Sequence, residues 1–115
     1  MSKIHIIFGP QGAGKTTYSK KLSEEVKGIH LSIDDWMWKL FGEDLPKPMN
    51  LKWIMERVER CEKQIWSIST QISESGSDVI LDLAFTKKAK RELFKTLADD
   101  QNIPTQVHLS MLLIQ

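Results

Sequence analysis

Residues 9 to 16 read Gly-Pro-Gln-Gly-Ala-Gly-Lys-Thr and match the whole pattern G-x-x-x-x-G-K-[ST]. The apolar run IHIIF directly precedes this loop, and a helical pattern follows it. This order predicts a strand, a glycine-rich turn and a helix. The backbone N–H groups of the turn and the positive end of the helix dipole then converge on one place, which favours a polyphosphate. The alternative, a glycine turn that caps an ordinary helix, does not require these surroundings.

Each position of the loop has a predicted role. Its glycines permit turns that a Cβ atom would obstruct. Lys15 can reach the β- and γ-phosphates of a nucleotide, and the hydroxyl group of Thr16 is placed to ligate Mg²⁺. Thr17 could add a contact to the α-phosphate. The residues expected to bind the nucleotide are Gly9, Pro10, Gln11, Gly12, Ala13, Gly14, Lys15, Thr16 and Thr17.

Length and composition limit the class of protein. The 115 residues suit a single nucleotide-binding domain spanning 1–115, and 16 basic against 15 acidic residues exclude a surface that binds polyanions everywhere. Cys61 is the only cysteine, which excludes an internal disulfide and a cysteine metal cluster. Neither a membrane-spanning run nor a signal-peptide pattern is visible, so we expect a soluble, cytoplasmic protein without a membrane partner.

Hydrophobic periodicity predicts alternating strands and helices. The clearest element is the stripe at steps of three and four residues between Ile54 and Ile72, which is typical of a long amphipathic helix. Such alternation predicts an α/β fold, with a parallel sheet, helices on both faces and ligands at the carboxyl ends of the strands. The predicted strands are 4–8, 29–33, 79–81 and 107–113, and the predicted helices are 17–27, 34–41, 51–75 and 86–99.

Acidic residues follow two of these strands, where the carboxylates needed for phosphoryl transfer would be expected. Asp82 ends the third strand, the position at which P-loop proteins place the acid that holds Mg²⁺ directly or through water. The alternative is that Asp82 simply ends the strand. Asp34 and Asp35 follow the second strand, but Ser32-x-x-Asp35 also fits a helix capping box, and Asp34 is a good N-cap. Spacing alone leaves capping and catalysis equal for this acidic pair.

Four basic residues crowd the first turns of the helix predicted at 86–99, namely Lys87, Lys88, Lys90 and Arg91. The helix dipole disfavours each cation there by about 0.3–1 kcal/mol. Either solvent screens these charges or an anion compensates them. Arg91 is best suited to a bidentate contact with a phosphate group.

Aromatic residues and histidines are interpreted mainly as structural. Trp38 is the one candidate for lining the pocket of a phosphate acceptor. The histidines have no metal-ligand spacing. The residues expected in structural roles are Trp36, Trp53, Trp66, His5, His30 and His108.

The segments GPQGAGKTT, HLSIDDWMW and VILDLAFTKKAKRE, in this order, resemble the small P-loop kinases of the AAA-domain group. That group is related to the families of polynucleotide kinase, zeta toxin and chloramphenicol phosphotransferase. The resemblance implies ATP and Mg²⁺ as cofactors and the strand order 2-3-1-4-5. It further implies that Asp34 is the base that accepts the proton of the acceptor hydroxyl and that Asp35 helps to place this base. By the same resemblance, Asp82 matches the acid that ends the third strand of the family, and Arg91 matches the basic residue in the helix that follows that strand.

The same resemblance predicts a departure at the carboxyl end. In those families the fourth strand leads to a lid whose arginines surround the transferred phosphate, whereas the arginines here are Arg57, Arg60 and Arg91. An arginine clamp is worth about 10³–10⁵ in rate. We therefore expect a truncated relative that binds nucleotide and transfers phosphate poorly.

Two functions remain open at this stage. The first is an ATP-dependent kinase that phosphorylates a hydroxyl of a small molecule or a nucleic-acid end. The second is a catalytically weak or inactive nucleotide-binding remnant that acts through a partner. The apolar run from Met111 to Ile114 and an uncovered sheet edge also predict self-association.

Overall fold

The computed structural model describes residues 2–8, 14–83 and 88–109. Within these residues one parallel sheet has the strand order β2-β3-β1-β4. This arrangement confirms the predicted parallel α/β architecture, and it matches the first four strands of the implied order 2-3-1-4-5. The strands are β1 (Ile4–Phe8), β2 (Ile29–Ser32), β3 (Val79–Asp82) and β4 (Thr105–Leu109).

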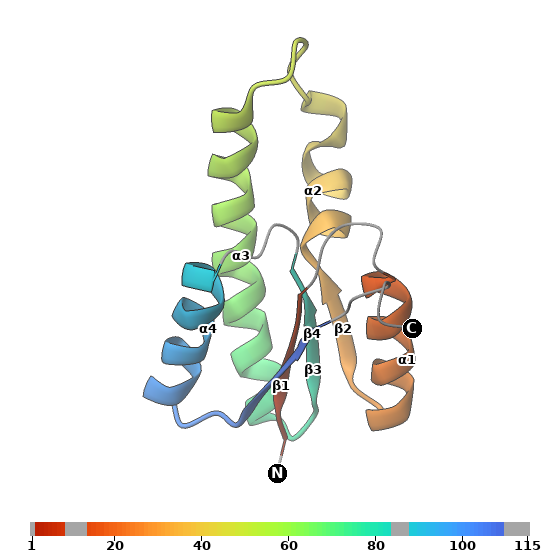
Figure 1. The fold of residues 1–115 in the computed structure, drawn as a ribbon, viewed down its shortest axis with the longest axis vertical. Helices are drawn as coiled ribbons and strands as arrows, with labels where there is room; N and C mark the ends of the chain where they lie inside the picture. Colours follow the sequence, from red (N-terminus) through yellow and green to blue (C-terminus); the bar gives the residue numbers. More distant parts are fainter. Residues whose placement is uncertain (1, 9–13, 84–87, 110–115) are drawn as a thin grey trace.

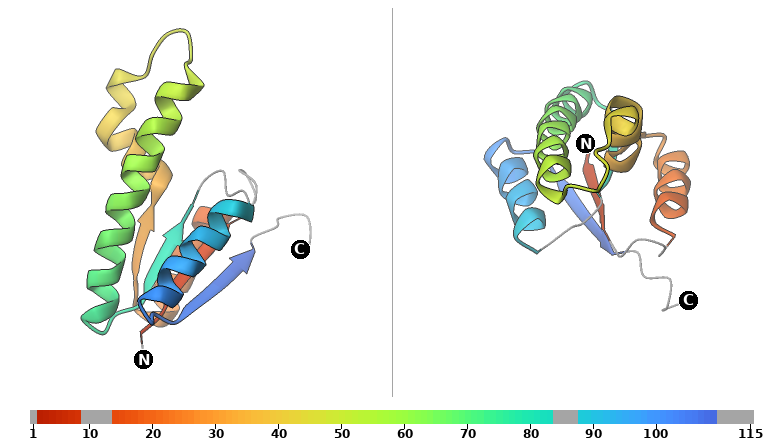
Figure 2. Two further views of the ribbon diagram at one scale, coloured as in Figure 1. Left: turned by 90° about the vertical axis from the view of Figure 1, so that its left-hand side faces the viewer. Right: turned by 90° about the horizontal axis from the view of Figure 1, so that it is seen from above.

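Helices cover both faces of the sheet, as Figures 1 and 2 show. The helix α1 lies on one face, and α3 and α4 lie on the other. The helices α2 and α3 form a hairpin that rises beyond the carboxyl ends of the strands (Figure 1). The helical elements are α1 (Lys15–Val26), α2 (Ile33–Phe41), the 3-10 turn η1 (Gly42–Asp44), α3 (Leu51–Glu74) and α4 (Lys88–Asp100).

The face that carries α3 and α4 holds the main apolar core. Val58, Cys61 and Ile65 of the predicted stripe of α3 are buried there, with Ile65 only 1% exposed. Ile54, Ile68 and Ile72 of the same stripe are half-buried. Fully burying a side chain of this size contributes about 1.5–3 kcal/mol. The strand residues in this core are Ile4, Ile6, Val79, Leu81 and Leu83, and its helical residues include Val58, Cys61, Ile65, Trp66, Phe94 and Ala98.

The face that carries α1 is more polar, because successive side chains of a strand point to opposite faces. His5 and Asp82 are buried on this side and lie outside the apolar cluster. The buried positions of α1 are Lys15 and Ser19, and the hydroxyl of Ser19 donates to the Lys15 carbonyl oxygen at 2.8 Å. The α1 layer therefore brings polar groups against the sheet.

Gly28 was predicted to end the first helix, but α1 ends at Val26 and its C-cap is Lys27 in the left-handed conformation, with φ 55°. Gly28 follows this cap and joins it to β2. A Cβ atom at this position would lie 2.8 Å from both the Asp78 carbonyl oxygen and Cδ1 of Ile80. These distances are too short for a real side chain. The close approach of this turn to the start of β3 therefore requires glycine.

Several element boundaries differ from the prediction by one or two residues. The structure has α1 at Lys15–Val26 instead of 17–27, β3 at Val79–Asp82 instead of 79–81, and α4 at Lys88–Asp100 instead of 86–99. Ile33 is the first residue of α2, so β2 ends one residue early. The strand β4 begins at Thr105, two residues before the predicted start, because its backbone pairs from Ile4↔Thr105 onward. The described part of β4 ends at Leu109, and the predicted positions 110–113 lie outside the described residues.

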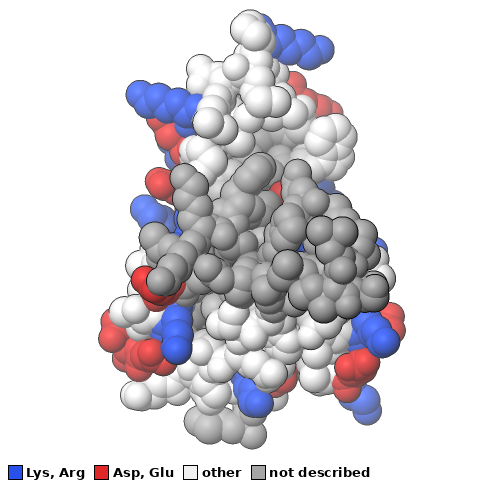
Figure 3. Space-filling model, in the orientation of Figure 1, with Lys and Arg blue, Asp and Glu red and all other residues white. Residues whose placement is uncertain are grey.

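Surface features agree with the composition. Acidic and basic side chains are interspersed on the face shown in Figure 3. Trp66 is buried and Trp38 is 70% exposed, as the assignment of the tryptophans predicts. Trp36 and Trp53 are half-buried. Among the described helices, none combines the length and the apolar character needed to cross a membrane.

Candidate nucleotide site

The predicted phosphate loop connects β1 to α1. Its residues Gly9, Pro10, Gln11, Gly12 and Ala13 lie outside the described residues, and the description resumes at Gly14. Gly14 is the N-cap of α1, with φ 72° and ψ 19°. Glycine adopts this left-handed conformation without a steric penalty. The strand before the loop and the helix after it are present as the motif requires.

Lys15 occupies the first turn of α1 and is only 6% exposed. Its Nζ atom donates to the Leu83 carbonyl oxygen at 2.8 Å and lies 3.6 Å from Oδ1 of Asp82. A buried ammonium group needs such partners, because burying an unpaired charge is costly. The end of β3 therefore holds the charge of Lys15 in place.

Asp82 and Thr16 lie together at the same edge of the sheet. The Thr16 hydroxyl donates to Oδ2 of Asp82 at 3.4 Å. Asp82 pairs in register with Ile7 of β1 and Ser32 of β2, so the carboxyl ends of the three strands coincide. A hydroxyl and a carboxylate supply the oxygen ligands that Mg²⁺ prefers. The residues predicted for the metal thus fit it chemically.

His30 is a neighbour of Asp82 that the sequence did not reveal. Its Nε2 atom lies 3.4 Å from Oδ2 of Asp82. His30 stands two residues before Ser32, the register partner of Asp82, and therefore faces the same side of the sheet as Asp82. Periodicity within β2 could not provide that register.

The acidic pair after β2 lies in the first turn of α2. Ser32 is the N-cap, and its side chain accepts from the backbone N–H of Asp35 at 3.3 Å. The suggestion that Asp34 caps the helix is therefore wrong. Asp34 is exposed, and Asp35 forms an exposed ion pair with Lys39 at 3.1 Å. The acceptor-side roles predicted for both acids remain predictions.

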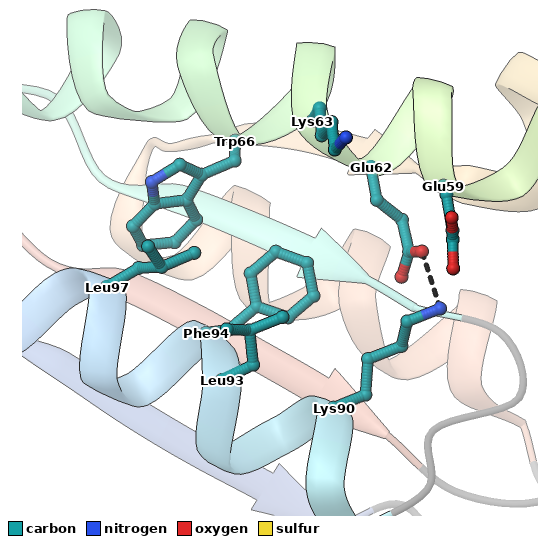
Figure 4. A pocket seen from close by; sticks show the side chains of 8 residues that line it. All are labelled: Glu59, Glu62, Lys63, Trp66, Lys90, Leu93, Phe94 and Leu97. Atoms are coloured by element: carbon teal, nitrogen blue, oxygen red, sulfur yellow. Dashed lines mark ion pairs between the residues drawn. The ribbon is translucent and has the colours of Figure 1, made fainter.

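The basic start of α4 has a compensating anion within the protein. The Nζ atom of Lys90 lies 2.6 Å from Oε1 of Glu62 on α3, at one end of a groove between the two helices (Figure 4). Burial raises the pKa of Glu62, and the ion pair with Lys90 opposes this effect. Lys87 and the side chains of Lys88 and Arg91 lie outside the described set. The role predicted for Arg91 stays a prediction.

A second polar cluster, here called the histidine network, lies on the α1 face. Asp78 Oδ2 contacts His5 Nε2 at 2.9 Å, and His5 Nδ1 contacts His108 Nε2 at 3.1 Å. Nδ1 of His108 contacts the Tyr18 hydroxyl at 2.8 Å. The described residues contain no group of three or more histidine, cysteine or acidic side chains arranged for a metal. The contacts of the network join β1, β4 and α1.

The network also shifts the pKa values of two of its members. Burial tends to raise the pKa of Asp78, but hydrogen bonds from His5 and the backbone of Lys3 make the overall shift downward. Burial lowers the pKa of His108, and the charges of His5 and Lys3 lower it further. Both shifts favour the state in which Asp78 is ionised and His108 is neutral.

Comparison with known proteins places these features in a family. The family model described as AAA domain matches residues 4–110. An adenylate kinase from Petrotoga mobilis is 30% identical over 101 residues, covering 80% of this chain and 47% of that protein. The chain thus spans about half the length of that relative.

Solved structures share the fold. A candidate kinase from Chloroflexus aurantiacus has a TM-score of 0.77 and 17% identity, over 95% of this chain and 59% of its own. An APS kinase from Mycobacterium tuberculosis has a TM-score of 0.71 and 18% identity, over 99% of this chain and 78% of its own. These likenesses confirm the α/β P-loop fold.

Proposed function

The chain belongs to the AAA domain family, and on this premise we propose that it binds ATP with Mg²⁺ and transfers the γ-phosphate to a hydroxyl group. The family match and the likeness to adenylate kinase support a nucleotide-binding kinase in general terms. The observation that carries the proposal is the convergence of Lys15, Thr16 and Asp82 at the carboxyl ends of β1 and β3.

The predicted phosphate side of the site works by charge. Phosphoryl transfer depends mainly on positioning and on neutralising negative charge. An ammonium group has three donors, so Lys15 can keep its bond to the Leu83 carbonyl and still donate to a phosphate oxygen. Thr16 and Asp82 would hold Mg²⁺, which when bound supplies further positive charge to the phosphates.

The predicted acceptor side lies on α2. Asp34 follows Ser32, the register partner of Asp82, and would accept the proton of the acceptor hydroxyl, with Asp35 helping to place that hydroxyl. Trp38 stands four residues after Asp34, and residues at this spacing share a helix face. Because Trp38 is 70% exposed, it is free to line a pocket for the acceptor. The acceptor class is a small molecule with a hydroxyl group or a nucleic-acid end.

Binding is tested first, by calorimetry with ATP, ADP and GTP in the presence and absence of Mg²⁺. We expect the adenine nucleotides to bind, and to bind more tightly with Mg²⁺. Failure of the folded protein to bind any of the three nucleotides would contradict the proposal.

Catalysis is tested by the turnover of ATP with hydroxyl acceptors for the wild type and Asp34→Asn. Loss of a general base typically lowers the rate by about 10²–10⁴-fold. Asp44→Asn, which changes an exposed acid of η1, is the matched control and should leave the rate unchanged. Equal rates for the wild type and Asp34→Asn would remove Asp34 from the mechanism. Tight ADP binding without any turnover would favour a nucleotide-binding protein that acts through a partner.

A further inference from the structure

The three histidines of the chain lie in different hydrogen-bonding environments, although all three lie on strands. Both ring nitrogens of His5 have partners, and so do both ring nitrogens of His108. In contrast, Nε2 of His30 is buried and has no hydrogen-bond partner among the described residues. A buried polar atom left unsatisfied costs about 1–3 kcal/mol. His30 is therefore the histidine whose polar group is not explained by packing.

The Asp82 carboxylate lies beside Nε2 of His30. The distance from His30 Nε2 to Oδ2 of Asp82 is 3.4 Å, close enough for an ion-pair contact but without hydrogen-bond alignment. Thr16 Oγ1 lies 3.4 Å from the same oxygen. On the other side of the carboxylate, Oδ1 faces Lys15. Asp82 thus lies among an ammonium group, a hydroxyl and an imidazole.

We propose that His30 is a positioning residue that donates its Nε2–H to Oδ2 of Asp82 and fixes this carboxylate for Mg²⁺. The direction of the bond follows from the chemistry, because an ionised carboxylate can only accept. This inference rests on the proposed function, since it assumes that Asp82 serves the metal of a bound nucleotide.

The proposed effect of His30 is that of a residue that hydrogen-bonds to a metal ligand without contacting the metal. A hydrogen bond to a ligating carboxylate restricts its orientation, and loss of such a partner typically costs about 10-fold to 100-fold in metal affinity. Because His30 comes from β2, it would couple the orientation of Asp82 on β3 to the neighbouring strand. His30 itself contacts neither nucleotide nor metal in this proposal.

The test measures the affinity for ADP by calorimetry over a series of Mg²⁺ concentrations. His30→Leu removes the donor, and we expect the apparent affinity for Mg²⁺ to fall by about 10-fold to 100-fold. The affinity for ADP without Mg²⁺ should stay at the wild-type value, which a general loss of structure would not allow. His30→Gln retains an N–H donor near the position of Nε2 and should restore most of the Mg²⁺ dependence.

His108→Gln is the matched control, because it changes a histidine on a strand of the same sheet that contacts His5 and Tyr18 rather than Asp82. Its Mg²⁺ dependence should equal that of the wild type. A wild-type Mg²⁺ dependence in His30→Leu, or no recovery in His30→Gln, would overturn the inference while leaving the proposed function intact. Absence of nucleotide binding in the wild-type protein would overturn both.

Discussion

The two faces of the sheet use the same strands for different purposes. On the side of α3 and α4, the strand residues are aliphatic, and they pack on Ile65, Trp66 and Phe94. On the side of α1, the same strands present the buried polar side chains of His5 and Asp82 beside the buried aliphatic side chains of Ile7 and Ile80. The comparison teaches that alternation along a strand places a buried aliphatic side chain and a buried carboxylate on opposite faces of the sheet, one residue apart. Leu81 and Asp82 are the clearest pair.

The largest expected effect is a loss of unfolding free energy when a buried residue of the apolar face is truncated. Leu81→Ala removes a side chain that is 0% exposed, and such a change in a core typically costs about 2–5 kcal/mol of unfolding free energy. Urea denaturation measures this loss. The control Leu93→Ala changes a side chain that is 53% exposed and should alter stability by less than about 0.5 kcal/mol. Similar losses in the two variants would contradict the burial of Leu81 in the apolar core.

The next largest expected effect is a loss of nucleotide affinity when a charged residue of the polar face is replaced. Lys15→Met keeps much of the apolar stem but removes the ammonium group, and hydrogen bonds of charged groups contribute about 1.5–3 kcal/mol. We therefore expect nucleotide affinity to fall by about 10-fold to 150-fold, as measured by calorimetry on protein shown to be folded. Lys20→Met removes an exposed lysine of the same helix and is the control. An unchanged affinity in Lys15→Met would refute the phosphate site.

A smaller effect is expected from the histidine network, which we compare with the nucleotide site on the same face. Tyr18→Phe removes the hydroxyl that contacts His108 at 2.8 Å. Because this contact is exposed, we expect a loss of roughly 0.5–1 kcal/mol in unfolding free energy and little change in nucleotide affinity. Denaturation and calorimetry on one sample distinguish the two quantities. A fall in affinity that exceeds the fall in stability would place Tyr18 in the nucleotide site instead.

The smallest expected effect is a difference in the pH dependence of the two faces. The lowered pKa of His108 means that the unfolded chain binds protons more readily, so this contribution to stability is present above pH 6.5 and is lost as the pH falls toward the folded pKa. The pKa of Asp78 is also lowered, so its contribution to stability is lost in the same direction, as the pH falls below 3.8. Glu62 acts in the opposite direction, because its raised pKa favours the folded state below 4.5, an advantage lost as the pH rises.

Melting temperatures at a series of pH values test these signs. His108→Gln should flatten the decline of the melting temperature between about pH 7 and pH 5, the range in which histidine titrates. Glu62→Gln should not flatten that decline, because the titration of Glu62 has the opposite sign. A steeper decline in His108→Gln would show that the network does not hold His108 in its neutral form.

Local patterns predicted much of the fold. The stripe on α3 predicted the helix and the burial of Val58, Cys61 and Ile65, because burial of one face at a period of 3.6 residues leaves a direct record in the sequence. The other stripe residues, Ile54, Ile68 and Ile72, are half-buried. The phosphate-loop pattern likewise predicted the junction between β1 and α1. These elements depend on neighbours along the chain, so their signals are local.

The contacts of the candidate site depend on pairings across the sheet and were harder to predict. His30 and Asp82 meet because β2 and β3 align in a particular register, which no periodicity encodes. The sequence left open whether solvent screens Lys90 or an anion compensates it, and the contact with Glu62 depends on how α3 and α4 pack together. Thr105 was missed because the backbone, rather than an apolar side chain, defines the start of β4.

The pairing of Asp82 with both Ile7 and Ser32 has a consequence for misfolding. If β3 slipped by one residue, every side chain would exchange sides, and the carboxylate would enter the space now filled by aliphatic groups. Burial of an unpaired charge would make that misaligned chain unstable. Asp82, the residue proposed to serve the metal, therefore also disfavours a misaligned sheet, because a wrongly paired molecule would bury its carboxylate without a partner.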